Sequence, residues 1–322
     1  MPAKTKFELK PGPATREAFG RALVELGREN KDIVVCDADL SKSTMTVYFQ
    51  KEFPDRFFSF GIAEANMVAQ AAGMAYAGKI PFAASFSAFV MNKGFEQLRV
   101  CVAYPNVNVK IVGTHSGISI GEDGPSQMSV EETSLACSLP GFVVISPADE
   151  ASTKALVRAA AAHVGPVFIR TGRPKAPIIY NGDQKFEIGK AVELVEGSDV
   201  TIVANGLLVA EAIRAAETLE AEGISARVLD LHTVKPLDRE ALRRAAAETG
   251  AIVAAEEHLV DGGMGVRVAQ AVAEMHPVPM EFVGIQDTYA ESGKPDELLE
   301  KYGLVARDIV AAVRKVLTRK RR

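Results

Sequence analysis

Short runs rich in valine and isoleucine alternate with segments of helical spacing along this chain, and this alternation limits the folds open to it. In the first part of the chain the apolar runs lie at residues 32–40, 80–84, 107–112, 142–145 and 167–170. The segments with helical spacing lie at residues 15–26, 63–77, 88–104, 130–138 and 146–163. Such strands are typical of a parallel sheet that helices cover on both faces. The sequence therefore predicts an α/β fold with a doubly wound, mostly parallel sheet.

The alternation stops at residues 174–190 and then resumes. Pro174, Pro177, Asn181 and Gly182 are turn formers, which indicates a linker. Further strands are predicted at residues 200–204, 226–229, 252–255 and 280–283, and helices near 208–222, 238–249, 266–275, 296–302 and 307–317. A length of 322 residues suits two domains. We predict one doubly wound domain over residues 1–173, a linker over 174–190, and a second such domain over 191–322.

The composition excludes several classes of protein. A net charge of −4 gives no basic footprint for nucleic acid. No apolar run approaches the length of a membrane span, and residues 1–10 lack the apolar core of a signal peptide. Cys36, Cys101 and Cys137 have no metal-ligand spacing, so we expect reduced thiols and no metal ligands in this chain. We expect a cytoplasmic protein that binds neither nucleic acid nor membranes.

One carboxylate is out of place in the stretch "GIAEANMV", residues 61–68. Glu64 lies among small and apolar residues of a segment that is predicted to be a buried helix. A charge there costs several kcal/mol unless another group pairs with it. From this stretch alone, Glu64 is either an acid stabilised by the helix dipole or a functional carboxylate.

Three segments are expected at the carboxyl ends of the first strands, where α/β sheets bind ligands. They are "CDADLSKST" (36–44), "ASFSAF" (84–89) and the long glycine-rich loop "GTHSGISIGEDGPSQ" (113–127). Long loops in compact domains are often functional, and His115 and Asp123 are expected to face the same crevice. The spacing of Phe86 and Phe89 by itself favours core packing.

Three arginines, at the end of a strand and at the start of a helix, are candidates for anion binding. Arg170 and Arg173 follow a strand in "FIRTGRP", and Arg16 begins a helix. A guanidinium group can bind a phosphate with its fork of donors. Pairing with a nearby acid explains Arg170 and Arg173 equally well, and for Arg16 plain solvation is the better explanation from the sequence alone. The sequence has no P-loop and no HExxH motif.

Taken together, the ordered motifs resemble transketolase over nearly the whole chain. The motifs are "TREAFG", "DADLSKST", "GIAEANMV", "SFSAF", "THSGISIGEDGPSQM", "FIRTGRP" and "KPLD". The resemblance implies a pyrimidine-binding domain and a C-terminal domain with thiamine diphosphate as cofactor. The Gly-Asp-Gly motif with a downstream Asn, which in this family holds the diphosphate through a metal ion, is missing here. This implies a split transketolase, in which a separate N-terminal subunit supplies that domain and its divalent metal ion, Mg or Ca.

The resemblance assigns the cofactor contacts. It implies that Glu64 shares a proton with a nitrogen of the aminopyrimidine ring and is catalytic. A carboxylate that is removed from water has a raised pKa, which suits this role. Phe89 is expected to stack on the ring with Phe86 beside it, and Asp39 and Leu40 to line the thiazolium side.

The resemblance also assigns the substrate contacts. His115 and Asp123 are expected to contact the hydroxyls of the donor sugar, with His115 helping to move its protons. Arg16, Ser43 and Arg173 are expected to bind the substrate phosphate. Gln127 is expected to contact substrate, although bacterial enzymes of the family often have a histidine there.

The implied reaction transfers a two-carbon ketol unit from a ketose phosphate to an aldose phosphate. We expect activity only with the N-terminal subunit, in an α2β2 heterotetramer that serves the pentose phosphate pathway or the supply of aromatic precursors. One alternative is the β subunit of a 2-oxo acid dehydrogenase, and a second is a fragment of deoxyxylulose phosphate synthase. A third is a regulatory or scaffolding subunit without activity.

Overall fold

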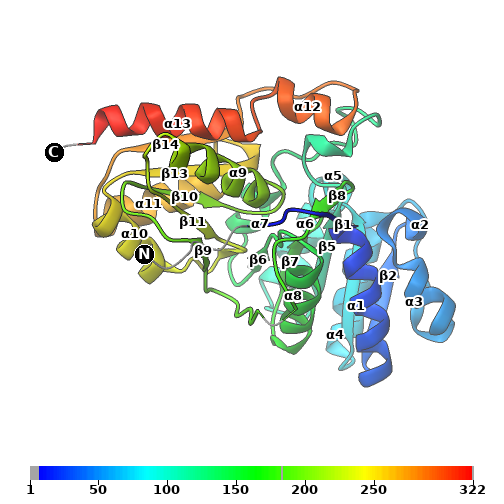
Figure 1. Ribbon diagram of the computed structural model, residues 1–322. Coiled ribbons are helices and arrows are strands. Elements are labelled where there is room, and N and C mark those ends of the chain that lie inside the picture. The colour runs from blue at the N-terminus through cyan, green and yellow to red at the C-terminus, as the bar shows by residue number, and fades with distance from the viewer. Residues whose placement is uncertain (1–6, 183, 321–322) are drawn as a thin grey trace.

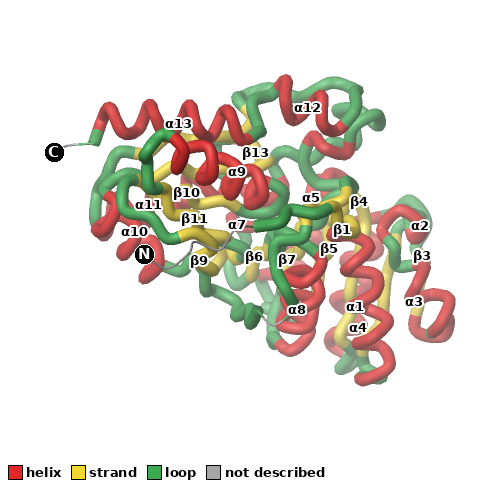
Figure 2. The backbone as a smooth tube through the Cα atoms, in the orientation of Figure 1, coloured by secondary structure: helices red, strands yellow, loops and turns green. Residues whose placement is uncertain are grey.

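The computed structural model describes residues 7–182 and 184–320, which form two α/β halves (Figure 1). Among these residues, a seven-stranded sheet forms the centre of the first half and a five-stranded sheet that of the second, and a separate sheet has two strands. In Figure 2 the strands lie at the centre of each half and the helices lie outside them. This is the predicted fold class. Among the described residues, no helix is both long and apolar enough to cross a membrane.

The first sheet is parallel except at one edge. Its strands in spatial order are β12 (Thr233–Lys235), β6 (Val143–Ile145), β7 (Val167–Arg170), β5 (Lys110–Thr114), β4 (Ile80–Phe86), β2 (Ile33–Asp37) and β3 (Phe57–Ser59). Alternate residues of each strand enter different cores: Phe82 packs under one helical layer and Ala83 under the other. This two-sided burial explains the continuous apolar runs in the sequence.

The helical segments of this half cover both faces of the sheet. They are α1 (Thr15–Glu29), α2 (Ser41–Thr44), α3 (Val47–Glu52), η1 (Pro54–Arg56), α4 (Glu64–Tyr76), α5 (Ser87–Lys93), α6 (Phe95–Gln97), η2 (Leu98–Ala103), η3 (Ile118–Ile120), α7 (Glu132–Ser138) and α8 (Glu150–Ala162). The continuous helix predicted over residues 88–104 is wrong, because the chain is interrupted at Gly94 and continues as α6 and the π-helical η2. Glycine is a poor helix former, and Gly94, at φ −96° and ψ 1°, lies between the end of α5 and the start of α6.

The second sheet has the strand order β14 (Met280–Ile285), β13 (Ile252–Leu259), β10 (Val200–Ala204), β11 (Ala226–Asp230) and β9 (Val192–Val195). The edge strand β9 is antiparallel to its neighbour, and the others are parallel. The helices of this half are α9 (Leu208–Ala221), α10 (Arg239–Thr249), α11 (Met264–Met275), α12 (Pro295–Lys301) and α13 (Ala306–Arg319). In Figure 1, α12 extends from this half toward the first.

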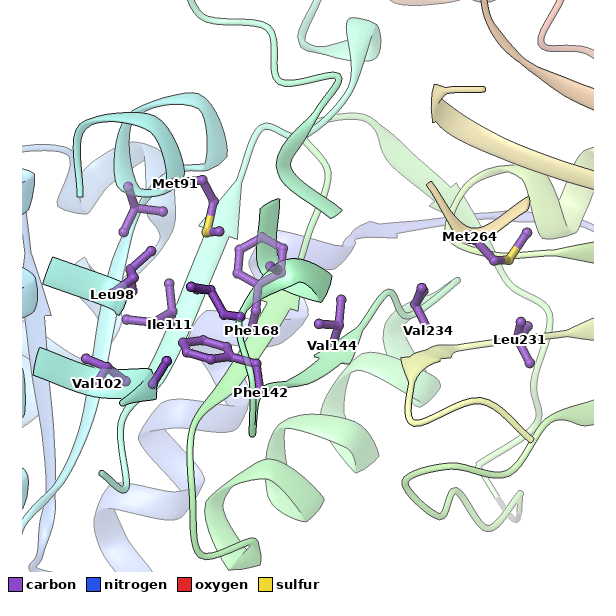
Figure 3. Close-up of a cluster of buried hydrophobic side chains, with 14 of the residues drawn as sticks. Met91, Leu98, Val102, Ile111, Phe142, Val144, Phe168, Leu231, Val234 and Met264 are labelled. Atoms are coloured by element: carbon purple, nitrogen blue, oxygen red, sulfur yellow. The ribbon is translucent and has the colours of Figure 1, made fainter. Parts of the chain in front are cut away.

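The two halves share strands and core. The three-residue strand β12 lies in the second half of the sequence, but it pairs with β6 of the first sheet. Within the expected linker, β8 (Lys175–Pro177) pairs with β1 (Pro11–Ala14). Figure 3 shows one apolar cluster that continues from Phe142 and Val144 to Leu231, Val234 and Met264 of the second half. The domain boundaries stay a prediction, since these contacts cross them.

Candidate active site

Four loops meet where the parallel strands of the first sheet end. They follow β2, β4, β5 and β7, which are neighbours in the sheet. Because parallel strands present their carboxyl ends at one edge, the segments after them converge there. This convergence brings several of the predicted site residues together.

Three aromatic rings form a stack at this edge. The rings of Phe86 and His115 lie 3.9 Å apart, centroid to centroid, and those of Phe86 and Phe89 lie 5.5 Å apart. Phe86 and His115 are buried, whereas Phe89 is half-buried. The stack therefore gives the buried histidine a rigid apolar support and leaves part of the Phe89 ring open to a ligand.

The hydrogen bonds of His115 define its tautomer. Its Nε2 lies 3.2 Å from the Nη1 of Arg16, and its Nδ1 lies 2.8 Å from the hydroxyl of Thr114. A guanidinium group only donates, so Nε2 accepts and Nδ1 carries the proton. Burial, followed by the charges of Arg16 and Arg173, lowers the pKa of His115 to about 3. At neutral pH this side chain is therefore uncharged, and its Nε2 is a hydrogen-bond acceptor.

Two arginines lie beside this histidine. The Nη1 of Arg16 also donates to the carbonyl of Ser43 at 2.7 Å, and the Nη1 of Arg173 donates to the carbonyl of Ile120 and, at 2.9 Å, to the exposed carboxylate of Glu122. Burial lowers the pKa of Arg16, and the charge of Arg173 acts in the same direction. Two neighbouring positive groups favour an anion between them, but the binding of the substrate phosphate by Arg16, Ser43 and Arg173 stays a prediction. Ser43 contributes its carbonyl to Arg16.

Glu64 has a partner that the sequence analysis missed. Its carboxylate is 3% exposed at the first residue of α4, where the helix dipole also stabilises an acid. The Nζ of Lys93 lies 3.2 Å from Glu64 Oε1 and 4.2 Å from the centroid of the Phe89 ring. One cationic group thus contacts both the carboxylate and the aromatic face. Both interpretations of Glu64 left open by the sequence are compatible with this position.

A buried acid shapes the loop after β2. Asp37, which was not predicted as a site residue, accepts hydrogen bonds from the Leu40 amide and from the hydroxyls of Thr44 and Thr46, at 2.7 to 2.9 Å. Burial raises the pKa of Asp37, and these hydrogen bonds oppose that rise. They hold Asp39 exposed in the left-handed region, at φ 63°, and Leu40 half-buried next to it. The signal in the sequence was an acid that ends a fully apolar strand.

Asp123 and Gln127 are not joined to this group. Asp123 is exposed, and Gln127 is half-buried and accepts a hydrogen bond from the Ser126 hydroxyl at 2.5 Å. Within the described part of the chain, no hydrogen bond links either residue to His115. Their predicted substrate contacts stay predictions.

Family models match both halves of the chain. The model described as "Transketolase, pyrimidine binding domain" matches residues 11–178. The model described as "Transketolase, C-terminal domain" matches residues 189–309. The chain belongs to the transketolase family. Since the first match spans β1 to β8, the edge described above is that of the pyrimidine-binding domain.

Individual transketolases extend this result. The chain is 44% identical to a "Putative transketolase C-terminal section" from Methanocaldococcus jannaschii, over 92% of this chain and 94% of that one. It is also 44% identical to a 6-deoxy-6-sulfo-D-fructose transketolase subunit from Clostridium sp. (strain MSTE9), over 95% of both. A solved structure described as "Split gene transketolase, inactive beta4 tetramer" is 52% identical, with a TM-score of 0.91, over 96% of this chain and 100% of that one. By contrast, the chain spans 51% of human transketolase.

These matches confirm the main conclusions from the sequence. The family, the fold class and the assignment to the C-terminal subunit of a split transketolase are confirmed, as is the enzyme class. The family implies thiamine diphosphate as cofactor. The individual roles of the site residues stay predictions.

The residues at this edge fit an aminopyrimidine ring. A flat heterocycle that carries hydrogen-bond donors suits the half-open face of Phe89 and the buried carboxylate of Glu64, and Lys93 already places a cationic donor against both groups. Among the described residues, no group of three or more His, Cys, Asp or Glu side chains could hold a metal ion. The chain therefore offers a site for the ring of the cofactor.

Replacing Lys93 by methionine is expected to tighten the binding of thiamine diphosphate. The ammonium group occupies the place where the ring would contact Glu64 and Phe89, so it must leave on binding. A half-exposed ion pair contributes up to about 1 kcal/mol, which limits the gain to about fivefold. Calorimetric titration of thiamine diphosphate into the complex of this chain and its partner subunit measures the change in affinity. Lys79→Met is the control, since it removes a lysine of similar exposure that pairs with the exposed Asp32 elsewhere. Weaker binding by Lys93→Met would mean that Lys93 contacts the cofactor.

Proposed function

We propose that this chain transfers two-carbon ketol units from ketose phosphates to aldose phosphates, together with an N-terminal subunit that holds the diphosphate of thiamine diphosphate through Mg or Ca. The observation that carries the proposal is the shared contact of one cationic group with Glu64 and Phe89, next to the pair Arg16 and Arg173. A site for a heterocyclic ring therefore adjoins a site for an anion, as this reaction requires.

Each residue of the edge has a defined task in this proposal. Bound thiamine diphosphate would supply the nucleophilic carbon and the electron sink for cleavage of the donor. Glu64 holds a proton against the ring, and Phe89 orients the ring by stacking. His115 is neutral, with a free lone pair at Nε2 once Arg16 turns to substrate, and accepts a hydrogen bond from a donor hydroxyl whose proton it helps to move. Arg16 and Arg173 bind the anionic end of the sugar and align it.

The proposed partner follows from the length of the relatives. The chain spans nearly all of the methanococcal C-terminal section but about half of human transketolase. The related split transketolase that was solved as a tetramer of β chains is described as inactive. We place this chain in an α2β2 assembly in the cytoplasm, in the pentose phosphate pathway or the supply of aromatic precursors.

The purified chain is expected to show no transketolase turnover until the N-terminal subunit is added. Mixing the two subunits with thiamine diphosphate and Mg should restore two-carbon transfer from fructose 6-phosphate, and light scattering should give the mass of an α2β2 complex. A 2-oxo acid, tested in parallel, should not be decarboxylated at a comparable rate. Full turnover by this chain alone, or preference for the 2-oxo acid, would contradict the proposal.

Arg173→Met is expected to raise the KM for anionic sugars by about tenfold to hundredfold, since a charge-assisted hydrogen bond contributes about 1.5 to 3 kcal/mol. The change in kcat should be small, because the phosphate lies away from the reacting carbons. Steady-state assays of the complex with fructose 6-phosphate, 6-deoxy-6-sulfofructose and fructose separate phosphate, sulfonate and neutral ends. Arg21→Met, which removes an exposed arginine paired with Glu150, is the control. An equal loss with neutral fructose would show that Arg173 does not bind the anion.

A further inference from the structure

An acid of the C-terminal domain reaches the glycine-rich loop of the pyrimidine-binding domain. Glu257 lies in β13 and is 2% exposed. Its Oε1 accepts a hydrogen bond from the backbone amide of Ser119 at 2.7 Å. Ser119 belongs to η3, which begins three residues after His115. A side chain from one domain is thus bonded to the backbone of the site loop in the other.

The loop is shaped to accept this carboxylate. Gly117 has φ +80°, and a Cβ added there would lie 2.2 Å from the carboxyl carbon of Glu257. Real Cβ atoms are never this close, so only glycine lets the loop backbone approach the acid. The Gly117 amide donates to the Ser129 carbonyl at 2.7 Å, which ties this point to the far end of the loop. The contact with Glu257 is therefore a close and specific fit.

An arginine of the first domain fixes Glu257 in turn. The Nη2 of Arg170 donates to the Glu257 carbonyl at 2.6 Å, and its Nε pairs with Glu132 Oε1 at 2.6 Å. A longer ion pair, at 3.9 Å, joins Arg170 to Glu257 Oε2. Because all three side chains are buried, the acid cannot turn toward solvent. It remains aimed at Ser119.

The loop segment held in this way also carries part of the anion site. Arg173 donates to the carbonyl of Ile120, next to Ser119. On its other side, Gly121 packs against Pro295 at the start of α12. The C-terminal domain thus contacts η3 through β13 and through α12, which extends over the first half in Figure 1. A shift of η3 would move the support of Arg173.

We propose that Glu257 is a positioning residue: by binding the Ser119 amide, it fixes residues 117–121 so that Arg173 and His115 meet the donor sugar in the required geometry. This gives the C-terminal domain a direct part in substrate binding. The expected effect of Glu257 on KM rests on the proposed function, whereas its expected effect on the loop at residues 117–121 does not.

Two measurements together test the positioning role of Glu257: hydrogen–deuterium exchange of the full chain and steady-state kinetics of the complex. Glu257→Ala is expected to speed exchange of the amides in residues 117–121 by about tenfold or more, because it removes one hydrogen bond at a buried site. It should raise the KM for fructose 6-phosphate by a similar factor, with a smaller change in kcat. Glu257→Gln keeps a carbonyl oxygen for the Ser119 amide and is expected to restore both values.

Glu256 provides the matched control. It is the preceding residue of β13, it is 4% exposed, and it accepts hydrogen bonds from the Met264 and Gly265 amides at the start of α11. Glu256→Ala should lower stability but leave exchange of residues 117–121 and the KM unchanged. If Glu257→Ala does not fold, Gly117→Ala, which presses a methyl group on the carboxylate, must show the same faster exchange.

Two results would overturn the inference. One is unchanged exchange at residues 117–121 in Glu257→Ala, or in Gly117→Ala if that variant has to replace it. The other is equal loop exchange in the Glu256 and Glu257 variants. Exchange is measured without substrate, so absence of transketolase activity in the wild-type complex would refute the proposed function and leave this test intact.

Discussion

The complex that carries Glu64→Gln is expected to lose transketolase turnover by about three orders of magnitude, within the range for loss of a proton-transfer group. Glutamine keeps the volume and one carbonyl oxygen, but its amide cannot take up and release a proton near neutral pH as a carboxyl group does. Because the carboxylate is buried, no water molecule can easily replace it. Steady-state assays of the complex with saturating thiamine diphosphate measure the change.

The control for this variant is another acid at the first position of a helix. Glu150 begins α8 as Glu64 begins α4, but Glu150 pairs with Lys154 and Arg21, away from the site. An acid that serves only the helix dipole contributes about 0.3 to 1 kcal/mol, so Glu150→Gln should change stability slightly and turnover not at all. If Glu64→Gln retained turnover within about tenfold of the wild-type value, Glu64 would be a structural acid.

The sequence was informative about Glu64 because a single charge stood out against an apolar helix. It could not supply Lys93, which lies on a different helix and is 48% exposed. A half-exposed lysine has no distinctive neighbours in the chain, and only the fold shows that its ammonium group lies over the Phe89 ring and beside the acid. Side chains that reach a site from the surface are therefore the hardest to predict.

Arg170 and Arg173 show a second limit. Both follow the same strand in one short segment, and from the sequence either could bind phosphate or pair with an acid. Burial separates them: Arg170 is 7% exposed and pairs with the buried Glu132, whereas Arg173 is partly exposed and pairs with the exposed Glu122. The acid that fixes this outcome comes from a helix 38 residues away in the sequence.

Strand prediction succeeded for the strands that are buried on both faces and for the edge strand β14, but it missed the short edge strands β3, β9 and β12. The central strands β2, β4 and β5 are continuous apolar runs and were predicted. The three-residue strand β12 has no periodicity to detect, and its partner β6 belongs to the other domain. Pairing between distant segments is a property of the tertiary fold, which is why the expected domain division missed this exchange.

Arg170→Met is expected to lower the free energy of unfolding by about 3 to 5 kcal/mol, because removing one partner of a buried ion pair leaves the other charge uncompensated. Here two acids lose their partner: Glu132, which is fully buried, and Glu257. Unfolding in urea, compared at equal protein concentration, measures the change. Arg158→Met also removes an arginine that pairs with two acids, Glu25 and Glu29, but at the surface, where about 1 kcal/mol or less is expected.

The pH dependence of this loss identifies its cause. Burial raises the pKa of Glu257, and Arg170 opposes that rise. Without Arg170 the folded-state pKa rises further above the unfolded value, so the penalty is absent below the unfolded pKa and grows as the pH rises toward the folded one. The deficit of Arg170→Met should therefore be smaller near pH 5 than near pH 8. A deficit that is equal at both values would point to lost packing of the arginine stem instead of an uncompensated charge.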